Sequence, residues 1–409
     1  MSKKDIIVQK FGGTSVATPE RIKNVAKKVS ACKRKGYDVV VVVSALGETT
    51  DELIKLADQI DTDPSEREMD MLLSTGEQIS VALLAMALHK IGEEAISFTG
   101  AQVGIMTDTS HTKARILDIS TERIKKELGK GKIVIVAGFQ GISLHHEITT
   151  LGRGGSDMTA VALAKVLKAK MCEIYTDVKG IYTADPRIVG NARKLDTICY
   201  DEMLELASLG AQVMQARSME VASKFNVPIH VRSSFSDDNG TIIGKEDKKM
   251  EEVLVRGVTV NKGEARVIVS GVPDKPGEAS RLFEYLAKEN INVDMIIQNK
   301  STSGTTDITF TAPESSLART QKVVDKASKE MGSAEVKYDK DIAKLSVVGI
   351  GMRSHAGVAA KMFKCLASKK INIEMISTSE IKISCVIKRK DADEAVKALH
   401  KAFGLDKVR

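Results

Sequence analysis

The sequence predicts an α/β protein with an open, mainly parallel sheet sandwiched by helices, followed by two ferredoxin-like βαββαβ domains. In the first half of the chain, short apolar runs alternate with longer amphipathic stretches, which is typical of strands and helices in a parallel sheet. In the second half, the surroundings of Gly271 return at Gly351, and those of Ile291 return at Ile371, which indicates a duplication. A chain of 409 residues is long enough for two or three domains.

Composition argues against several other classes of protein. The net charge is +7, but aromatic residues make up 4% of the chain and tryptophan is absent, so the stacking surfaces of nucleic-acid-binding proteins are not expected. The longest aliphatic run, residues 39–43, is too short to span a membrane, and no signal peptide is recognisable. Five scattered cysteines form no C-x-x-C pair and indicate reduced thiols. We therefore expect a cytoplasmic protein without nucleic-acid or membrane partners.

The first predicted strand, residues 6–10, ends at Lys10, and the second, residues 39–43, is followed by Ser44. A Gly-Gly turn follows Lys10, and a second small hydroxyl, Thr50, follows Ser44 before the next helix. Ligands of open α/β sheets bind beyond the carboxyl ends of the strands, so these residues are candidates for a binding site. The alternatives are a surface lysine beside a turn and a hydroxyl that caps a helix.

A long predicted helix, residues 69–90, contains Gly76 and Glu77 next to a stretch that is apolar nearly all round. A glycine and a carboxylate inside a core helix conflict with its local preferences. Such conflicts tend to mark functional sites.

Residues 151–157, Leu-Gly-Arg-Gly-Gly-Ser-Asp, precede another predicted helix, residues 158–169. The glycines let the backbone approach a ligand closely, and Ser156 or Asp157 is suited to cap the helix. The free N–H groups at a helix N-terminus attract anions, and Arg153 adds a forked cation for a carboxylate or phosphate. The alternative is a glycine-rich turn that only caps a helix.

The remaining elements of the first half are a strand at 172–177, a turn-rich segment at 178–187, a helical stretch at 203–225, a strand at 229–232 and a polar linker at 233–251. Thr176 and Asp177 therefore also lie at the carboxyl end of a strand. The P-loop, the complete G-x-G-x-x-G fingerprint and the protein-kinase motifs are all absent.

Three segments resemble the signatures of the aspartate kinases, which belong to the amino-acid kinase superfamily. They are Lys-Phe-Gly-Gly-Thr-Ser-Val at 10–16, Gly-Arg-Gly-Gly-Ser-Asp at 152–157 and Tyr-Thr-Asp-Val-Lys-Gly-Ile-Tyr-Thr-Ala-Asp-Pro-Arg at 175–187. The resemblance implies the amino-acid kinase fold. It also implies that the γ-phosphoryl group of ATP is transferred to the side-chain carboxylate of L-aspartate. The product would be 4-phospho-L-aspartate, in the first step of lysine, threonine and methionine biosynthesis.

Carried onto this sequence, the resemblance implies three groups of site residues. The catalytic residues would be Lys10, Arg153 and Asp157, with Asp157 organising Lys10 or the metal ion. ATP would be bound by Lys10, Phe11, Gly12, Gly13, Thr176, Asp177, Tyr182, Arg187 and Gln212. Aspartate would be bound by Ser44, Thr50, Glu77, Arg153, Gly154, Gly155 and Ser156, with Glu77 on its ammonium group and Arg153 on a carboxylate.

These residue types suit phosphoryl transfer, which needs mainly positioning and cancellation of charge on the equatorial oxygens. A carboxylate is already a nucleophile, so no catalytic triad is required. Mg²⁺ would bind mostly through nucleotide oxygens, and no protein cluster of metal ligands is expected. One position departs from the family pattern: many relatives have lysine where this chain has Gln212, which can form hydrogen bonds but supplies no charge.

The duplicated half predicts an insertion. Each copy has the order strand–helix–strand–strand–helix, and the first copy ends with a further strand at 334–338. The second copy has little room for one, whereas a spare strand at 253–260 precedes the first copy. The prediction is a catalytic domain at 1–248 and a regulatory region at 249–409, in which residues 265–340 are inserted between 253–262 and 341–409.

The two copies resemble ACT domains, which bind amino acids, and in aspartate kinases such domains confer feedback inhibition by lysine, threonine or both. The matching effector positions are Asp274, Pro276, Gly277, Glu278, Ala279, Asn292, Val293, Asp294 and Gln298 in the first copy, and Val358, Ala359, Asn372, Ile373, Ser379 and Glu380 in the second. A free edge strand in each copy favours a homo-oligomer, at least a dimer. Met250 is placed where an internal start would give a small subunit.

Two other functions remain as alternatives. One is another amino-acid or carbamate kinase, against which the ACT-like tail argues. The other is a catalytically silent amino-acid sensor, against which Lys10, Glu77, Arg153 and Asp157 argue.

Overall fold

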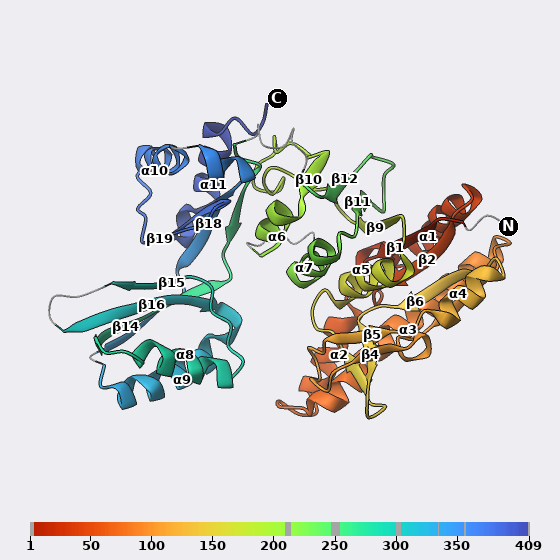
Figure 1. Ribbon diagram of the computed structural model, residues 1–409, viewed down its shortest axis with the longest axis horizontal. Helices are drawn as coiled ribbons and strands as arrows, with labels where there is room; N and C mark the ends of the chain where they lie inside the picture. The colour runs from red at the N-terminus through yellow and green to blue at the C-terminus, as the bar shows by residue number, and fades with distance from the viewer. Residues whose placement is uncertain are drawn as a thin grey trace. The chain divides into compact units, whose positions relative to one another are not determined.

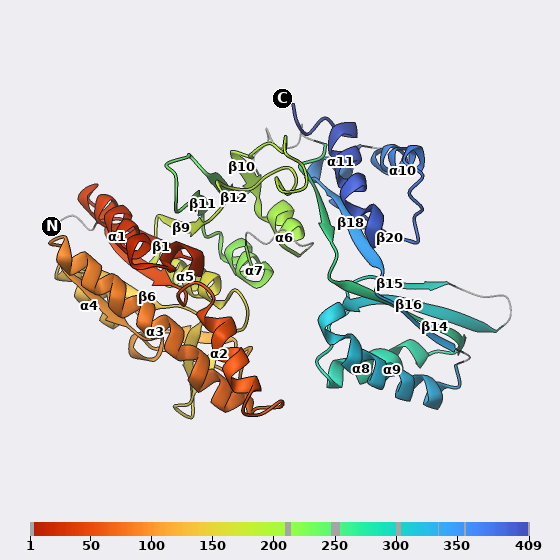
Figure 2. The ribbon, with the colours of Figure 1, turned by 180° about the vertical axis from the view of Figure 1, so that it is seen from behind.

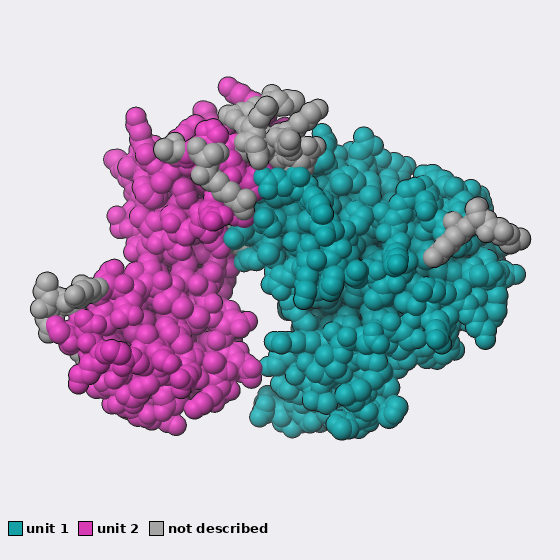
Figure 3. All heavy atoms as spheres, viewed as in Figure 1, with its two compact units in different colours: residues 1–182, 194–250 teal, residues 183–193, 251–409 magenta. Residues whose placement is uncertain are grey.

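A computed structural model describes residues 4–208, 214–246, 254–299, 304–333, 335–355 and 357–407 (Figure 1, and from behind in Figure 2). The chain divides into two units, which are described separately (Figure 3). The first comprises residues 1–182 and 194–250, and the second comprises residues 183–193 and 251–409. Segment 183–193, expected within the first domain, thus groups with the second unit.

The first unit is built on a sheet that has eight strands among the described residues. Their order is β10 (Thr197–Cys199), β12 (Thr241–Gly244), β11 (Ile229–Ser233), β9 (Met171–Thr176), β1 (Ile6–Phe11), β2 (Asp38–Val43), β6 (Ile133–Ala137) and β3 (Ala95–Phe98). Neighbouring strands are parallel except β11 and β12. The central strands β2 and β6 are apolar on both faces because helices cover both faces.

The helices of this unit are α1 (Pro19–Arg34), α2 (Thr49–Asp58), α3 (Glu66–Lys90), α4 (Glu122–Gly129), α5 (Gly155–Leu167), α6 (Tyr200–Ser208) and α7 (Ala216–Phe225). Helices α1 and α3 pack on one face of the sheet, where Phe11, Val41 and Ile135 join their core. Helix α5 packs along β1, β2 and β9 from the other face. The predicted fold class is confirmed.

A smaller sheet was not predicted. Its order is β5 (Ile116–Ile119), β4 (Ile105–Thr107), β7 (Gln140–Ser143) and β8 (Ile148–Thr150). Strands of three or four residues are too short to show a clear alternation of apolar and polar positions, so pairing across the chain defines them.

Two local predictions were wrong. The expected linker 233–251 contains β12, which pairs with β10 and β11 as part of the main sheet. Helix α5 begins at Gly155 and has Gly154 at its N-cap, not Ser156 or Asp157, because Gly154 adopts the left-handed conformation (φ 69°). By contrast, the prediction that residues 203–225 are mostly helical is confirmed within the described residues by α6 and α7.

Within the described ranges, α3 is one helix that is long and apolar enough to cross a membrane by composition alone. Half of its apolar stretch is buried, with Leu84 and Leu88 in the core beside the sheet. Core helices of globular proteins meet the same criterion.

The second unit contains two four-stranded antiparallel sheets among its described residues. The first has the order β15 (Ile296–Asn299), β16 (Thr305–Pro313), β14 (Glu264–Pro273) and β17 (Glu335–Asp339); the second has the order β13 (Gly257–Asn261), β18 (Ile342–Val348), β20 (Lys382–Lys388) and β19 (Met375–Thr378). Helices α8 (Glu278–Lys288) and α9 (Leu317–Met331) cover the first sheet, and α10 (Val358–Ser368) and α11 (Ala392–Ala402) cover the second. Strand β13 precedes the whole first sheet in sequence but pairs with β18.

The duplication is visible in backbone geometry. Gly277 and Gly357 both adopt φ 101° at the N-caps of α8 and α10. A Cβ atom at either position would meet no heavy atom within 4 Å, so the backbone conformation rather than space calls for glycine.

A charged cluster lies between the two sheets of the second unit. Lys344 is almost fully buried and pairs with Glu264 (2.7 Å between Nζ and Oε1) and with Asp294. Burial lowers the pKa of Lys344, but these two carboxylates outweigh it and raise that pKa above its ordinary value. Arg266 similarly joins Asp339 of the first copy to Glu374 of the second.

Candidate active site

Lys10 and Asp157 form an ion pair where strand β1 meets the first turn of α5. The distance between Lys10 Nζ and Asp157 Oδ1 is 2.7 Å, and their side chains are 13% and 9% exposed. Lys10 occupies the carboxyl-terminal end of β1, with Val42 and Ile174 beside it on the flanking strands. The pair leaves an oriented ammonium group at the edge of the sheet where ligands bind.

The turn after Lys10 packs tightly against the loop after β2. A Cβ atom on Gly13 would lie 2.9 Å from the carbonyl oxygens of Ala45 and Gly47, so only glycine fits there. The N–H of Gly47 donates to the Gly13 carbonyl (3.1 Å). At Gly12, a Cβ atom would lie 3.6 Å from Lys10 Nζ. Gly12 thus leaves open space beside Lys10, and Gly13 allows the two loops to pack closely together.

Glu77 lies under the same loop. Its side chain is buried, Oε1 accepts a hydrogen bond from the Ala45 N–H (3.1 Å), and Oε2 has no hydrogen-bond partner among the described residues. Burial raises the pKa of Glu77 to about 7, although the Ala45 hydrogen bond opposes this rise. A buried carboxylate with one oxygen unpaired is suited to accept a cationic partner.

Gly76 allows α3 to approach this loop. A Cβ atom on Gly76 would lie 2.8 Å from Ala45 Cβ, which is closer than real Cβ atoms come. The conflict noted in the sequence, a glycine beside a glutamate within a core helix, therefore has a structural cause: the glycine lets Glu77 reach the Ala45 N–H.

Gly76→Ala is expected to destabilise the protein by about 1–3 kcal/mol, because overpacking outweighs the gain in helix propensity. Gly129→Ala is the matched control, since Gly129 ends α4 with no heavy atom within 4 Å of its Cβ position. Thermal denaturation measures both variants. A melting temperature of Gly76→Ala at or above that of the wild type would contradict the packing argument.

Hydrogen bonds from the start of α7 hold the backbone of the glycine-rich loop, residues 151–157. Gln215 donates to the Arg153 carbonyl, and Arg217 donates to the Leu151 carbonyl (3.0 Å). The Arg153 side chain itself is exposed. A Cβ atom on Gly155 would lie 2.8 Å from Leu151 Cβ, so glycine lets α5 begin directly after the loop.

Ser156 and Asp157 follow in the first turn of α5, and both are buried. Ser156 lies against Gly138, where a Cβ atom would be 2.6 Å from the serine Oγ. Ser44 continues β2, with its N–H donating to the Phe11 carbonyl (3.1 Å), and Thr50 lies in the first turn of α2.

The residues predicted to bind ATP lie on several different elements of the fold. Thr176 ends β9 and donates to Asp177 Oδ1 (3.0 Å), and β9 is adjacent to β1. The Phe11 ring is fully buried and stacked on Tyr175, so only its backbone faces the site. Tyr182 forms an isolated antiparallel β-bridge with Lys194 through the backbone.

Arg187 belongs to the segment that groups with the second unit, and its side chain forms an ion pair with Asp185 (2.7 Å). Hydrogen bonding by Arg187 lowers the pKa of the Asp185 carboxyl. Gln212 lies outside the described residues.

Three residues that the sequence analysis overlooked support the site. Asp70 is fully buried in α3 and accepts hydrogen bonds from Thr112 N–H (3.0 Å) and the Thr150 hydroxyl, which ties the helix to the smaller sheet. Gln215 and Arg217 hold the glycine-rich loop as described above. In the sequence, an aspartate among the apolar residues of a predicted core helix is the feature that could have identified Asp70.

The predicted effector positions lie around the start of the first helix and around the following strand in each copy. Asp274, Pro276, Gly277, Glu278 and Ala279 form the turn before α8 and its start, and Asn292, Val293, Asp294 and Gln298 lie just before or within β15. In the second copy, Val358 and Ala359 begin α10, Asn372 and Ile373 precede β19, and Ser379 and Glu380 follow it.

A cluster of three or more His, Cys, Asp or Glu side chains able to hold a metal ion does not occur among the described residues. Asp157 is already paired with Lys10, and Asp177 is exposed at the end of β9.

Comparisons with known proteins identify the family. A model of the amino acid kinase family matches residues 5–233, and an ACT domain model matches residues 267–327 and 345–403. An aspartate kinase of Pseudomonas putida is 53% identical over 402 residues, covering 98% of both chains. An aspartokinase of Corynebacterium efficiens is 52% identical over 405 residues, covering 98% of this chain and 96% of the relative.

Among solved structures, E. coli aspartokinase III in complex with aspartate and ADP superimposes with a TM-score of 0.83 at 25% identity, covering 97% of this chain and 99% of that one. Aspartate kinase from Synechocystis is 48% identical with a TM-score of 0.55, covering 97% of this chain and 69% of that one. The two ACT domain matches fall on the two copies of the duplicated region. The chain therefore belongs to the amino acid kinase family and, within it, to the aspartate kinases with C-terminal ACT domains.

Proposed function

We propose that the enzyme transfers the γ-phosphoryl group of ATP to the side-chain carboxylate of L-aspartate and releases 4-phospho-L-aspartate. The observation that carries this proposal is the Lys10–Asp157 pair at the junction of β1 and α5, beside the turn that packs on the Glu77 loop. The solved E. coli relative, in complex with aspartate and ADP, agrees with these substrates.

In this proposal each group acts through charge and position. The aspartate side-chain oxygen attacks the γ-phosphorus, and the bond from that phosphorus to the bridging oxygen of ADP breaks. Lys10 stabilises the negative charge on the transferring group, and Asp157 holds the ammonium in place. Glu77 pairs with the substrate ammonium, and Arg153 pairs with a carboxylate. A bound Mg²⁺ ion would supply further neutralisation of the phosphate oxygens.

The test is an ADP-release assay with ATP, Mg²⁺ and L-aspartate, with hydroxylamine present to trap the acyl phosphate. Hydroxamate formation that depends on aspartate is the expected result. L-glutamate and a reaction without amino acid serve as controls. Turnover with another carboxylate or with carbamate, but not with aspartate, would instead favour a different kinase of the superfamily. Absence of turnover with every acceptor would favour an amino-acid sensor.

We also propose that the reaction begins lysine, threonine and methionine biosynthesis and that lysine, threonine or both inhibit it at the ACT domains. The support is a solved E. coli relative in complex with lysine and aspartate, described as its T-state. In this chain the effector position Asp294 is paired with Lys344 between the two sheets. An effector ammonium group would compete for the same carboxylate.

Asp294→Asn is expected to raise the inhibitory concentration of the effector about tenfold, because a charge-assisted hydrogen bond is lost. The kcat without effector should stay unchanged. Asp325→Asn is the control, since Asp325 accepts a hydrogen bond from Tyr338 in the same copy, at a position outside the predicted set. Equal inhibition curves for both variants would remove Asp294 from the effector site.

The assembly and the domain boundaries remain part of the proposal. The edge strands β15 and β19 carry the exposed side chains Ile296 (49%) and Ile376 (43%), which supports pairing of at least two chains through these sheets. Sedimentation equilibrium would measure the assembly, and a monomer at micromolar concentration would contradict it.

Met250 lies outside the described residues, and a single full-length band on a C-terminal immunoblot would dismiss an internal start. The proposed catalytic domain stays at 1–248 and the regulatory region at 249–409, apart from segment 183–193.

A further inference from the structure

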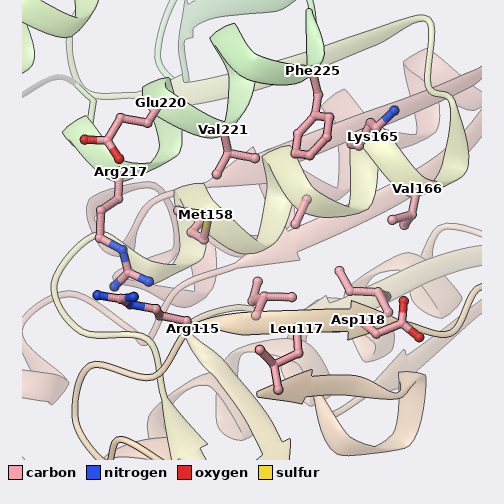
Figure 4. Close-up of a pocket in the computed structure, with 13 residues that line it drawn as sticks. Arg115, Leu117, Asp118, Met158, Lys165, Val166, Arg217, Glu220, Val221 and Phe225 are labelled. Carbon is pink, nitrogen blue, oxygen red and sulfur yellow. The ribbon is translucent and has the colours of Figure 1, made fainter. Parts of the chain in front are cut away.

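A cavity in the first unit is lined by none of the residues assigned to the substrates. It is a groove of about 670 Å³ between β5, α5 and α7 (Figure 4). Its volume falls within the range of small-molecule sites. It is lined by Arg115, Ile116, Leu117, Asp118, Ile119, Met158, Ala162, Lys165, Val166, Arg217, Glu220, Val221 and Phe225.

The middle of the groove is apolar. Figure 4 shows Met158 and Val221 opposite Leu117, with Phe225 further along. Leu117 is 59% exposed and Phe225 is 43% exposed, so large apolar side chains remain in contact with water. Covering them with an apolar ligand would gain hydrophobic free energy.

One end of the groove carries two positive charges. In Figure 4 the guanidinium groups of Arg115 and Arg217 lie next to one another, and the Glu220 carboxylate points away from them. Arg217 donates to the carbonyls of Leu151 (3.0 Å) and Ala114 (3.1 Å), which orient it without cancelling its charge. Neither arginine takes part in an ion pair within the parts of the chain that the structure describes. Two adjacent guanidinium groups favour an anionic oxygen group between them.

We propose that this groove is a second ligand site that binds an amphipathic anion. The carboxylate or sulfonate head group lies on Arg115 and Arg217, and a ring or short aliphatic body covers Met158, Val221 and Leu117. Charge complementarity at one end and exposed apolar surface along the rest define this class of ligand.

The groove is connected to the catalytic loop by covalent and hydrogen-bonded neighbours. Arg217 holds the Leu151 carbonyl at the start of the loop, and Met158 directly follows Asp157, the partner of Lys10. A head group that takes hydrogen bonds from Arg217 therefore competes with the Leu151 carbonyl. Occupation of the groove is expected to change the KM for aspartate.

The test uses the full-length protein and the fluorescent probe 8-anilinonaphthalene-1-sulfonate, which has an aromatic body and a sulfonate head. Saturable binding of one probe per chain, displaced by decanoate, is expected. Ala162→Phe fills the groove and Arg115→Gln removes a charge; each should weaken probe binding at least about fivefold. Arg319→Gln is the control, because Arg319 is an exposed arginine on α9 in the other unit.

Arg115→Gln also guards against misfolding, since the Arg115 side chain is exposed at the mouth of the groove. Equal probe affinity in the wild type and in both groove variants would overturn the site. A probe-induced shift in the aspartate KM that disappears in Ala162→Phe would support the link to the loop, and an unchanged KM at saturating probe would overturn that link. Probe binding needs no turnover, so its outcome is independent of the kinase assay.

Discussion

Lys10→Met is expected to lower kcat by about a hundredfold to a thousandfold, the loss usually seen when one preorganised charge-stabilising group is removed. Lys10 is the cation that β1 and Asp157 hold at the sheet edge, and its ammonium group is 2.7 Å from the Asp157 carboxylate. Methionine keeps the length and apolar stem of the side chain but cannot neutralise a phosphoryl oxygen. Steady-state kinetics at saturating ATP and aspartate measure the effect.

Lys170→Met is the matched control for this substitution. Lys170 also pairs with an aspartate, Asp5, but both side chains are more than half exposed and lie at the opposite end of the sheet. The kcat of Lys170→Met should equal that of the wild type. A kcat for Lys10→Met within tenfold of the wild type would rule out its proposed role.

The same substitution separates catalysis from stability. Lys10→Met leaves the Asp157 carboxylate buried without its partner, which is expected to cost about 3–5 kcal/mol. Adding Asp157→Asn removes that uncompensated charge, so the double variant should recover stability without recovering turnover. Denaturant unfolding together with kinetics distinguishes the two effects. Recovery of turnover in the double variant would show that the Lys10 charge is dispensable.

Glu77→Gln is expected to raise the KM for aspartate about tenfold to a hundredfold with a smaller change in kcat, because glutamine keeps the bond from Ala45 N–H but not the negative charge. The pKa of Glu77 is about 7, so the free enzyme loses the negative charge as the pH falls below 7. The wild-type kcat/KM for aspartate should therefore fall about tenfold per pH unit below 7 and level off above it.

The ratio of wild-type to Glu77→Gln kcat/KM isolates this carboxylate, because all other titrating groups are common to both enzymes. Glu93→Gln is the control, since Glu93 is a part-buried glutamate that pairs with Ser30 and Arg34 and has no predicted role in the site. A ratio that stays constant between pH 5.5 and 8.5 would contradict the assignment.

The raised pKa of Glu77 also predicts that its ionised carboxylate destabilises the folded state. Its pKa is raised on folding from 4.5 to about 7, so the folded state binds this proton more tightly than the unfolded state. The free energy of unfolding therefore falls as the pH rises from 4.5 to 7. The full loss, on the order of 3 kcal/mol, is reached above pH 7. Glu77→Gln should therefore be more stable than the wild type at pH 8, and the difference should vanish near pH 4.5.

The sequence motifs place several candidate site residues at the ends of strands. Lys10 and Thr176 are far apart in the chain, yet β1 and β9 are neighbouring parallel strands, so their carboxyl ends share one edge of the sheet. The same reasoning did not extend to Phe11, whose ring points into the core beneath α1 and α3. A motif shows that a position matters but not whether its backbone or its side chain acts.

The sequence by itself determined the α/β class, the duplication and the family, because apolar periodicity, an internal repeat and glycine-rich motifs are all local signals. Only the tertiary structure decided which residues support the site. Asp70, Gln215 and Arg217 act on segments far away in sequence, and the short strands of the smaller sheet are defined by partners rather than by their own composition. Contacts between distant segments depend on how the chain folds back on itself, and a single sequence does not encode those distances in any local pattern.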